Sequence, residues 1–188
     1  MIQCVFVQFS KEDDKMVKDT ILVIDVDVDG IQEIMNILSD SYRICTAGSF
    51  EDALLIIRDI IPELILIDST MSAKDGFDIL EFLKTNDKSS HIPVIFITPL
   101  DNPDFEVRAF DMGSVDYITK PFVPKVVRKR IETQIKLAKY EHKLEELVEE
   151  KVSEIEDMYD IMAISFAGLV ESRDGITGGH LKNTAIYY

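Results

Sequence analysis

Short apolar runs alternate with amphipathic stretches from residue 20 onward. The runs are rich in β-branched residues and lie at 21–24, 43–47, 64–67, 94–98 and 115–118. The third and fourth runs are almost continuously apolar, which is typical of strands covered on both faces. This pattern predicts the strands of one buried sheet.

The stretches between these runs have the spacing of amphipathic helices. Their apolar positions recur every three or four residues. They form four faces: Ile31, Ile34, Met35 and Leu38; Ala53, Leu54, Ile57 and Ile60; Phe77, Leu80, Phe82 and Leu83; and Phe105, Ala109 and Met112. Strands that alternate with helices predict right-handed crossovers and helices on both faces of the sheet. We therefore predict the α/β fold class, with a doubly wound five-stranded parallel sheet. The second strand, whose end is uncharged, is expected at an edge.

A long helical extension is predicted after the last strand, because the chain has no helix breaker from Val126 to Gly168. One heptad register places apolar residues at core positions: Leu137, Leu144, Val148, Ile155, Met158, Met162 and Leu169. Glu141 and Lys151 interrupt this seam. The pattern predicts a two-stranded coiled coil, with a single solvated amphipathic helix as the alternative. The earlier residues Ile131, Ile135 and Ala138 are expected to pack on the sheet.

Charge and composition narrow the function classes. The 188-residue chain has a formal net charge of −15, so we expect no direct binding to nucleic acid. No apolar run approaches the roughly 20 residues that span a membrane, so no membrane partner is expected. Cys4 and Cys45 lack metal-ligand spacing and fit a reduced, cytoplasmic compartment.

Polar side chains follow the ends of the predicted strands. Asp25 and Asp27 follow the first strand, Asp68 follows the third, Thr98 ends the fourth, and Lys120 follows the fifth. In open α/β sheets, functional groups collect outside the carboxyl ends of the strands. A carboxylate there can attack phosphorus, with Mg²⁺ offsetting the repulsion, while a hydroxyl and an ammonium hold phosphoryl oxygens. Each residue alone has a structural explanation as a cap, a strand former or a solvated charge. Together they predict a phosphoryl site.

Four segments resemble the signature blocks of response-regulator receiver domains, over about residues 20–138. They are "ILVIDVDVDG", "ELILIDSTMSAKDGFDIL", "PVIFIT" and "GSVDYITKPF". The resemblance implies a flavodoxin-like fold in which Asp68 accepts a phosphoryl group from a sensor histidine kinase. It implies that Thr98 and Lys120 contact that group, and that Tyr117 reorients with Thr98. It also implies a cis Lys120–Pro121 bond and a homodimer formed through the fourth helix, fifth strand and fifth helix, together with the linker helix.

The same resemblance implies a Mg²⁺ ion held by Asp25, Asp68 and the backbone carbonyl of Thr70. Val26 stands where family members commonly have a second acid. Asp27 is a further candidate ligand, directly or through water, although two residues of extended chain span about 7 Å.

Two other departures affect the site. Ser72 replaces a usual proline, and Pro99 replaces a small residue whose N–H often points to the phosphoryl group in the family. These changes predict a receiver that can be phosphorylated but is impaired.

Residues 139–170 are interpreted as the linker, and residues 171–188 as the start of another domain. "ESRDGITGGHLKNTAIYY" resembles the opening of an HD-GYP domain, a metal-dependent cyclic di-GMP phosphodiesterase. The resemblance places His180 at a position that can bind metal, and Ile176 where some members have a glutamate. One histidine cannot hold a hydrolytic metal, so we expect His180 to be unliganded and this chain not to be an enzyme. We interpret the chain as a fragment of a longer regulator, whose parent would be a phosphodiesterase, or as a truncated gene product.

Three hypotheses follow for residues 20–138, which are preceded by an N-terminal extension at 1–19. The first is a phosphorelay receiver that signals from Asp68, through a dimerising helix, to an HD-GYP output domain. The second is a phosphorylation-impaired pseudo-receiver that serves as a dimerisation or docking module. A small phosphatase ranks third, because no second acid for acid–base work is evident near Asp68.

Overall fold

The computed structural model describes residues 18–71, 73–99 and 103–173. The chain divides into two compact units, Met1–Tyr140 and Glu141–Tyr188. The described part of the first unit contains a parallel sheet, helices α1 to α4 and the beginning of helix α5 (Pro124–Arg173). The described part of the second unit is the remainder of α5.

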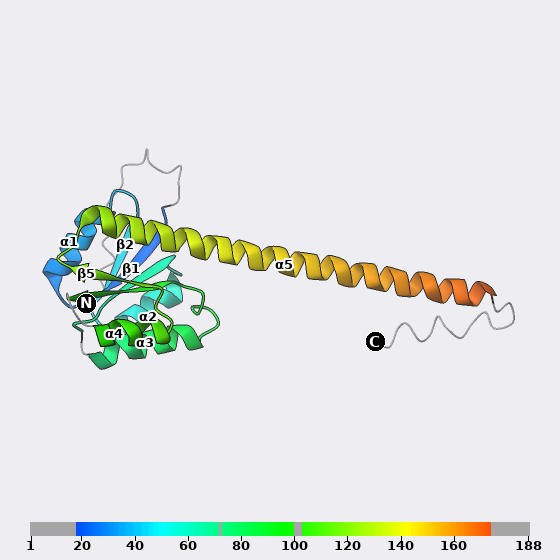
Figure 1. The fold of residues 1–188 in the computed structure, drawn as a ribbon, viewed down its shortest axis with the longest axis horizontal. Helices are drawn as coiled ribbons and strands as arrows, with labels where there is room; N and C mark the ends of the chain where they lie inside the picture. Colours follow the sequence, from blue (N-terminus) through cyan, green and yellow to red (C-terminus); the bar gives the residue numbers. More distant parts are fainter. Residues whose placement is uncertain (1–17, 72, 100–102, 174–188) are drawn as a thin grey trace. The chain divides into compact units, whose positions relative to one another are not determined.

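The sheet has five parallel strands in the order β2-β1-β3-β4-β5 (Figure 1). Their bounds are β1 Thr20–Ile24, β2 Arg43–Ala47, β3 Leu64–Asp68, β4 Val94–Pro99 and β5 Asp116–Lys120. This is the flavodoxin-like order of doubly wound folds, so the predicted fold class is confirmed. The second strand lies at an edge, as its uncharged end suggested.

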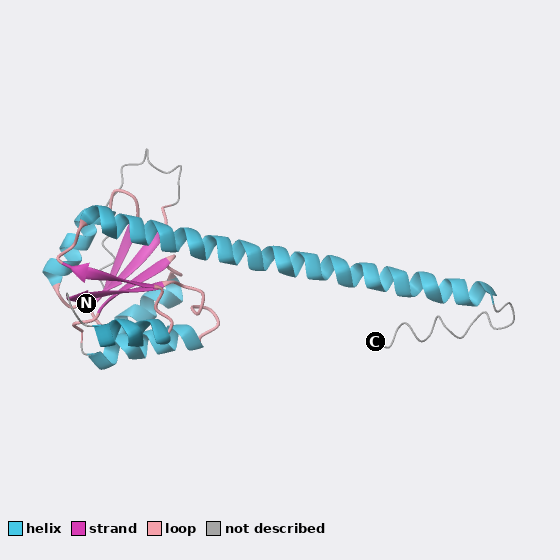
Figure 2. Ribbon diagram, viewed as in Figure 1, coloured by secondary structure: helices cyan, strands magenta, loops and turns pink. Residues whose placement is uncertain are grey.

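Helices cover both faces of the sheet (Figure 2). They are α1 Val28–Leu38, α2 Phe50–Asp59, α3 Ala73–Thr85 and α4 Pro103–Asp111, followed by α5. Side chains of α1 and α5 pack with one set of strand residues, and side chains of α2, α3 and α4 pack with the other set. Successive strand residues point to opposite faces, which is why β1 and β3 are apolar at nearly every position.

Two helical faces differ in detail from the prediction. On α2 the buried residues are Ala53 and Ile56, whereas Leu54 is only half-buried. On α3, Phe82 is 37% exposed, and its ring meets the ring of Phe50 at 5.7 Å. Apolar residues spaced three or four apart fit two adjacent faces of a helix almost equally well. The buried face is therefore decided only by how the helix packs on the sheet.

Helix α5 begins as part of the core around the sheet. Ile131 and Ile135 are buried against the α1 side of the sheet, as predicted, and Ala138 is half-buried. The Arg128 Nε donates a hydrogen bond to the Ile37 carbonyl at 2.8 Å, at the end of α1. The helix continues through Gly168, because glycine weakens a helix without removing a backbone donor as proline does.

The apolar positions of the heptad register are exposed in the described part of the chain. They are Leu137, Leu144, Val148, Ile155, Met158, Met162 and Leu169. Their pairing as a coiled coil stays a prediction. No helix within the described ranges is long and apolar enough to cross a membrane. Ser72, Ile176 and His180 lie outside the described residues, as do 1–17 and 174–188 as a whole.

Candidate functional site

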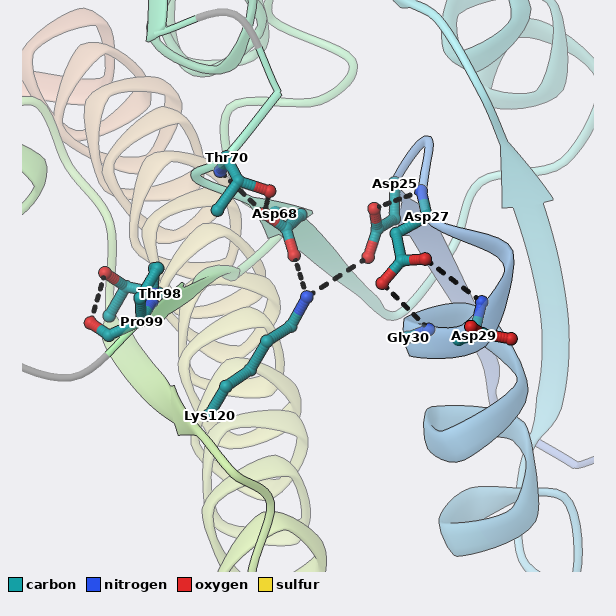
Figure 3. Close-up of polar contacts among 9 residues, drawn as sticks. All are labelled: Asp25, Asp27, Asp29, Gly30, Asp68, Thr70, Thr98, Pro99 and Lys120. Atoms are coloured by element: carbon teal, nitrogen blue, oxygen red, sulfur yellow. Dashed lines mark hydrogen bonds and ion pairs between the residues drawn. The ribbon is translucent and has the colours of Figure 1, made fainter.

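The Asp68 carboxylate is the most tightly held group at the carboxyl edge of the sheet. Asp68 ends β3 and is fully buried. Its Oδ1 accepts hydrogen bonds from the backbone N–H and the hydroxyl of Thr70, at 2.6 and 2.5 Å. Its Oδ2 lies 2.5 Å from the Lys120 Nζ (Figure 3). Burial raises the pKa of Asp68, but the hydrogen bonds from Lys120 and Thr70 lower it by more, so the net pKa is below 3.8. The charged, nucleophilic form is therefore favoured.

Asp25 is the second buried acid, directly after β1. Its Oδ1 accepts a hydrogen bond from the Asp27 N–H at 2.8 Å, and its Oδ2 lies 3.8 Å from the Lys120 Nζ. Burial raises the pKa of Asp25 from 3.8 to about 6; the Asp27 N–H opposes this shift, and the negative charge of Asp68 adds to it. One ammonium group thus faces two buried carboxylates with very different proton affinities.

Thr98 lies at this edge, but its hydroxyl is turned elsewhere. Its strand, β4, pairs with β3 so that Asp68 is opposite Ile97, and Thr98 is buried. The Thr98 hydroxyl donates to the Pro99 carbonyl at 3.1 Å and points away from Asp68 in Figure 3. The structure therefore brings Asp25 and Lys120 to Asp68, whereas the Thr98 hydroxyl would have to turn to meet a group bound there. The expected cis Lys120–Pro121 peptide bond is present.

Tyr117 belongs to the surface formed by α4, β5 and α5. Its ring meets the edge of the Phe110 ring at 6.0 Å and lies 5.6 Å from the Arg130 guanidinium. A hydrogen bond with Glu106 raises the pKa of its phenol. Arg130 also forms an ion pair with Asp116. Residues of α4 and α5 therefore hold the Tyr117 side chain in its present position.

The two buried carboxylates fit a Mg²⁺ ion of the kind that accompanies phosphate groups. Such an ion typically takes one or two carboxylates and completes its shell with phosphate oxygens and waters. Asp25 and Asp68 are close enough to interact, and the Thr70 carbonyl is the further ligand implied by the resemblance. Within the described ranges, no group of three or more His, Cys, Asp or Glu side chains is placed to hold a metal.

The two residues after Asp25, Val26 and Asp27, differ in what they can offer a metal ion. Val26 is 60% exposed and offers no oxygen ligand from its side chain. Asp27 is the N-cap of α1, where its two carboxylate oxygens accept from the N–H groups of Asp29 and Gly30, both at 3.2 Å. Asp27 as a metal ligand therefore competes with its role as a helix cap.

Sequence reasoning missed two features of the site. Thr70 was named for its backbone carbonyl but not for its hydroxyl, which donates a hydrogen bond to Asp68. Gly30 was also missed. Its signal was a glycine in the first turn of a helix, where alanine is intrinsically better.

Comparisons with known proteins agree with this geometry. Residues 21–132 match the response regulator receiver domain family. A Vibrio cholerae relative named "Probable cyclic di-GMP phosphodiesterase" is 34% identical over 175 residues, which cover 89% of this chain and 40% of that protein. Response regulator PleD of Caulobacter vibrioides is 32% identical over 103 residues, 54% of this chain and 22% of PleD. The chain thus spans less than half of either relative.

Solved structures show the same fold. NtrX from Brucella abortus, in complex with ADP, superposes with a TM-score of 0.64 at 29% identity, over 70% of this chain and 29% of NtrX. The chemotaxis protein CheY4 of Vibrio cholerae superposes with a TM-score of 0.58, over 62% of this chain and 98% of CheY4. At 20% identity, the second likeness concerns the fold alone.

Proposed function

This chain belongs to the response regulator receiver family, and from that premise we propose that Asp68 accepts a phosphoryl group from a sensor histidine kinase. The strongest support is the 2.5 Å contact between the Asp68 Oδ2 and the Lys120 Nζ at the carboxyl edge of the sheet. This contact keeps the carboxylate charged and places a cation where phosphoryl oxygens would arrive. The buried Asp25 beside it supports a magnesium-dependent reaction.

The transfer itself is a displacement at phosphorus. An Asp68 oxygen attacks the phosphorus, the bond between phosphorus and the donor histidine breaks, and its electron pair stays on the histidine nitrogen. Asp25, Asp68 and the Thr70 carbonyl would hold Mg²⁺, which neutralises charge on the phosphoryl oxygens. Lys120 would move its ammonium from the carboxylate to the acyl phosphate. The Thr98 hydroxyl would leave the Pro99 carbonyl, and Tyr117 would then turn toward the space vacated.

We propose that the phosphorylated receiver acts through a homodimer. The α4–β5–α5 surface exposes Val107, Phe110 and Val126, and α5 adds its apolar stripe. The output is proposed to be an HD-GYP domain, because the phosphodiesterase relative matches 89% of this chain. This chain would then bind and signal without hydrolytic activity of its own.

A pseudo-receiver that works as a dimerisation or docking module is the second candidate. Three observations favour it. Position 26 has no acid, Pro99 has no backbone N–H to donate, and the Thr98 hydroxyl is engaged with the Pro99 carbonyl. A module of this kind would keep the fold and the dimer surface while its response to phosphoryl donors is lost.

Incubation of the full chain with Mg²⁺ and acetyl phosphate separates the two candidates. We expect the intact mass to increase by one phosphoryl group, and beryllofluoride to shift the amide resonances of Thr70 and Thr98. The substitution Asp68→Asn should abolish both responses. Asp29→Asn is the matched control, because Asp29 is an exposed acid in the first turn of α1. No adduct at millimolar Mg²⁺ would leave only the docking module.

A further inference from the structure

Gly30 occupies a place where a glycine is not required by the backbone. It is the third residue of α1, and its backbone is helical. Among the glycines of the described ranges, Gly113 is the one with a positive φ, 99°. Glycine inside a helix is less favourable than alanine, so Gly30 weakens α1 without a conformational reason.

The space beside Gly30 supplies the reason. A Cβ at this position would lie 3.1 Å from the Asp25 Oδ2, 3.2 Å from the Asp27 Oδ2 and 3.2 Å from the Lys120 Nζ. Other described glycines differ. A Cβ on Gly48 would meet nothing within 4 Å, and a Cβ on Gly76 would meet only apolar side chains. Three charged groups therefore converge on the bare Cα of Gly30.

We infer that Gly30 is a positioning residue of the proposed site, and that its missing side chain lets Asp27 serve as the second acid that position 26 lacks. The inference rests on the proposed function, because the cation concerned is the one that phosphoryl transfer requires. Asp27 faces the same space as Asp25 and Lys120, so it can act on that cation through a water or by direct contact. Groups just outside the ligand shell tune metal affinity strongly.

Asp27 can exchange its helix-cap hydrogen bonds for a contact with the cation, because those bonds are long and Asp27 is exposed. Its two hydrogen bonds to the Asp29 and Gly30 N–H groups are 3.2 Å long, at the upper end of the usual range. Asp27 is exposed, so water can replace it at the first N–H groups of α1. An alanine at position 30 would instead push the Asp27 carboxylate and the Lys120 ammonium outward, because the buried Asp25 has no room to move.

The test is a Mg²⁺ titration of the full chain, followed by the amide chemical shifts of residues 25–30. The variants are Gly30→Ala, Asp27→Asn, the two combined, and Gly48→Ala as the matched glycine control. Asn caps a helix as well as Asp does, so Asp27→Asn removes charge and keeps the cap. We expect Mg²⁺ binding to weaken about tenfold in both single variants and to be unchanged in Gly48→Ala. The double variant should be little weaker than either single variant, since both changes act through Asp27.

Urea unfolding of the same variants separates positioning from folding. Gly30→Ala should unfold at the same or a higher urea concentration, because alanine favours the helix. Wild-type Mg²⁺ affinity in either single variant would overturn the inference. Weakening by Gly30→Ala alone would also overturn it, since Gly30 would then act through Asp25 and Lys120 without Asp27. A wild-type protein that binds no Mg²⁺ would contradict both the inference and the proposed function, whereas wild-type binding with unaffected variants contradicts the inference only.

Discussion

Asp25, Asp68 and Lys120 place two buried carboxyl groups beside one partly exposed ammonium group at the carboxyl edge of the sheet. The single ammonium lies much closer to Asp68 than to Asp25, 2.5 Å against 3.8 Å. Because of this asymmetry, the pKa of Asp68 is lowered, whereas the pKa of Asp25 is raised by burial. Paired acids whose pKa values are pushed apart have separate roles, here a charged nucleophile and a proton-sensitive neighbour.

Asp25 should make the folded protein less stable as the pH rises. Its pKa is about 6 in the folded protein and near 3.8 when unfolded, so the folded state binds the extra proton between these values. Stability therefore falls as the pH rises from about 4 to about 6, and the loss is complete above pH 6. Asp25→Asn should remove this penalty and raise the free energy of unfolding at pH 7.5 by about 1–3 kcal/mol.

Urea unfolding at pH 4.5 and pH 7.5 checks this prediction. The variant should gain less at the lower pH, where Asp25 in the wild-type protein is already largely neutral. Because the pKa of Asp68 is lowered, its own contribution has the opposite sign and is present in both proteins. An Asp25→Asn variant that is less stable at pH 7.5 would contradict the assignment.

At the residue scale, the sequence predicted which groups share the edge but not how they are oriented. The approach of Lys120 to Asp68 follows from strand order, because parallel strands end on one side of the sheet. The direction of the Thr98 hydroxyl depends on a side-chain rotamer and on the neighbouring carbonyl. The space at Gly30 depends on where three separate segments meet. Neither feature leaves a periodic signal in the chain.

Helix α5 is the element that the receiver shares with the second unit. Ile131 is fully buried in the sheet-facing part of the helix, while Ile155 is 46% exposed further along it. The Arg128 hydrogen bond to Ile37 connects this part of α5 to α1, and the Lys139–Asp19 ion pair connects it to the residue before β1. One helix therefore contains a segment packed on the sheet and a segment whose apolar residues are exposed.

Alanine substitutions of two isoleucines should distinguish these segments. Ile131→Ala should destabilise the receiver by about 2–5 kcal/mol, because it leaves a cavity against the sheet. Ile155→Ala should change receiver stability by no more than about 0.5 kcal/mol, since its side chain is not part of that core. Native-state hydrogen exchange of the β3 amides reports receiver stability in both variants. Equal losses of stability in the two variants would contradict this division of α5, because they would show that the core of the sheet extends to Ile155.

Elements were predicted more accurately than the faces of those elements. All five strands begin and end within two residues of the predicted runs, because apolar runs rich in β-branched residues are a strong signal for strands. The choice of Ile56 over Leu54 on α2 and the exposure of Phe82 on α3 required the actual position of each helix on the sheet. Helix α5 runs to Arg173, beyond the predicted end of the linker at residue 170.

At the scale of the whole molecule, the exposed stripe on α5 favours association with a second copy. The acidic residues of the helix lie mostly off the seam, and Lys151 at a seam position contacts Glu154 in its own helix at 2.8 Å. Ile155 is a seam residue, whereas Ile164 lies off the seam with 67% exposure. The two isoleucines thus offer a matched pair for testing a dimer that the proposed function requires.

Ile155→Glu should raise the dimer dissociation constant roughly 100-fold, since each chain would place a carboxylate in the apolar seam at a cost of about 3 kcal/mol. Ile164→Glu adds the same charge outside the seam and should leave the dissociation constant nearly unchanged. Sedimentation velocity over a range of protein concentrations measures both. A wild-type chain that stays monomeric throughout would favour the solvated single helix instead.

The ion pair at Lys120 has a chemical consequence for this side chain. Burial lowers the pKa of Lys120, but the hydrogen bond and charge of Asp68 raise it by more, so the amine stays protonated. A protonated amine has no free lone pair with which to attack an acyl carbon. Acetyl phosphate, which donates acetyl as well as phosphoryl groups, should therefore modify exposed lysines such as Lys125 well before it modifies Lys120.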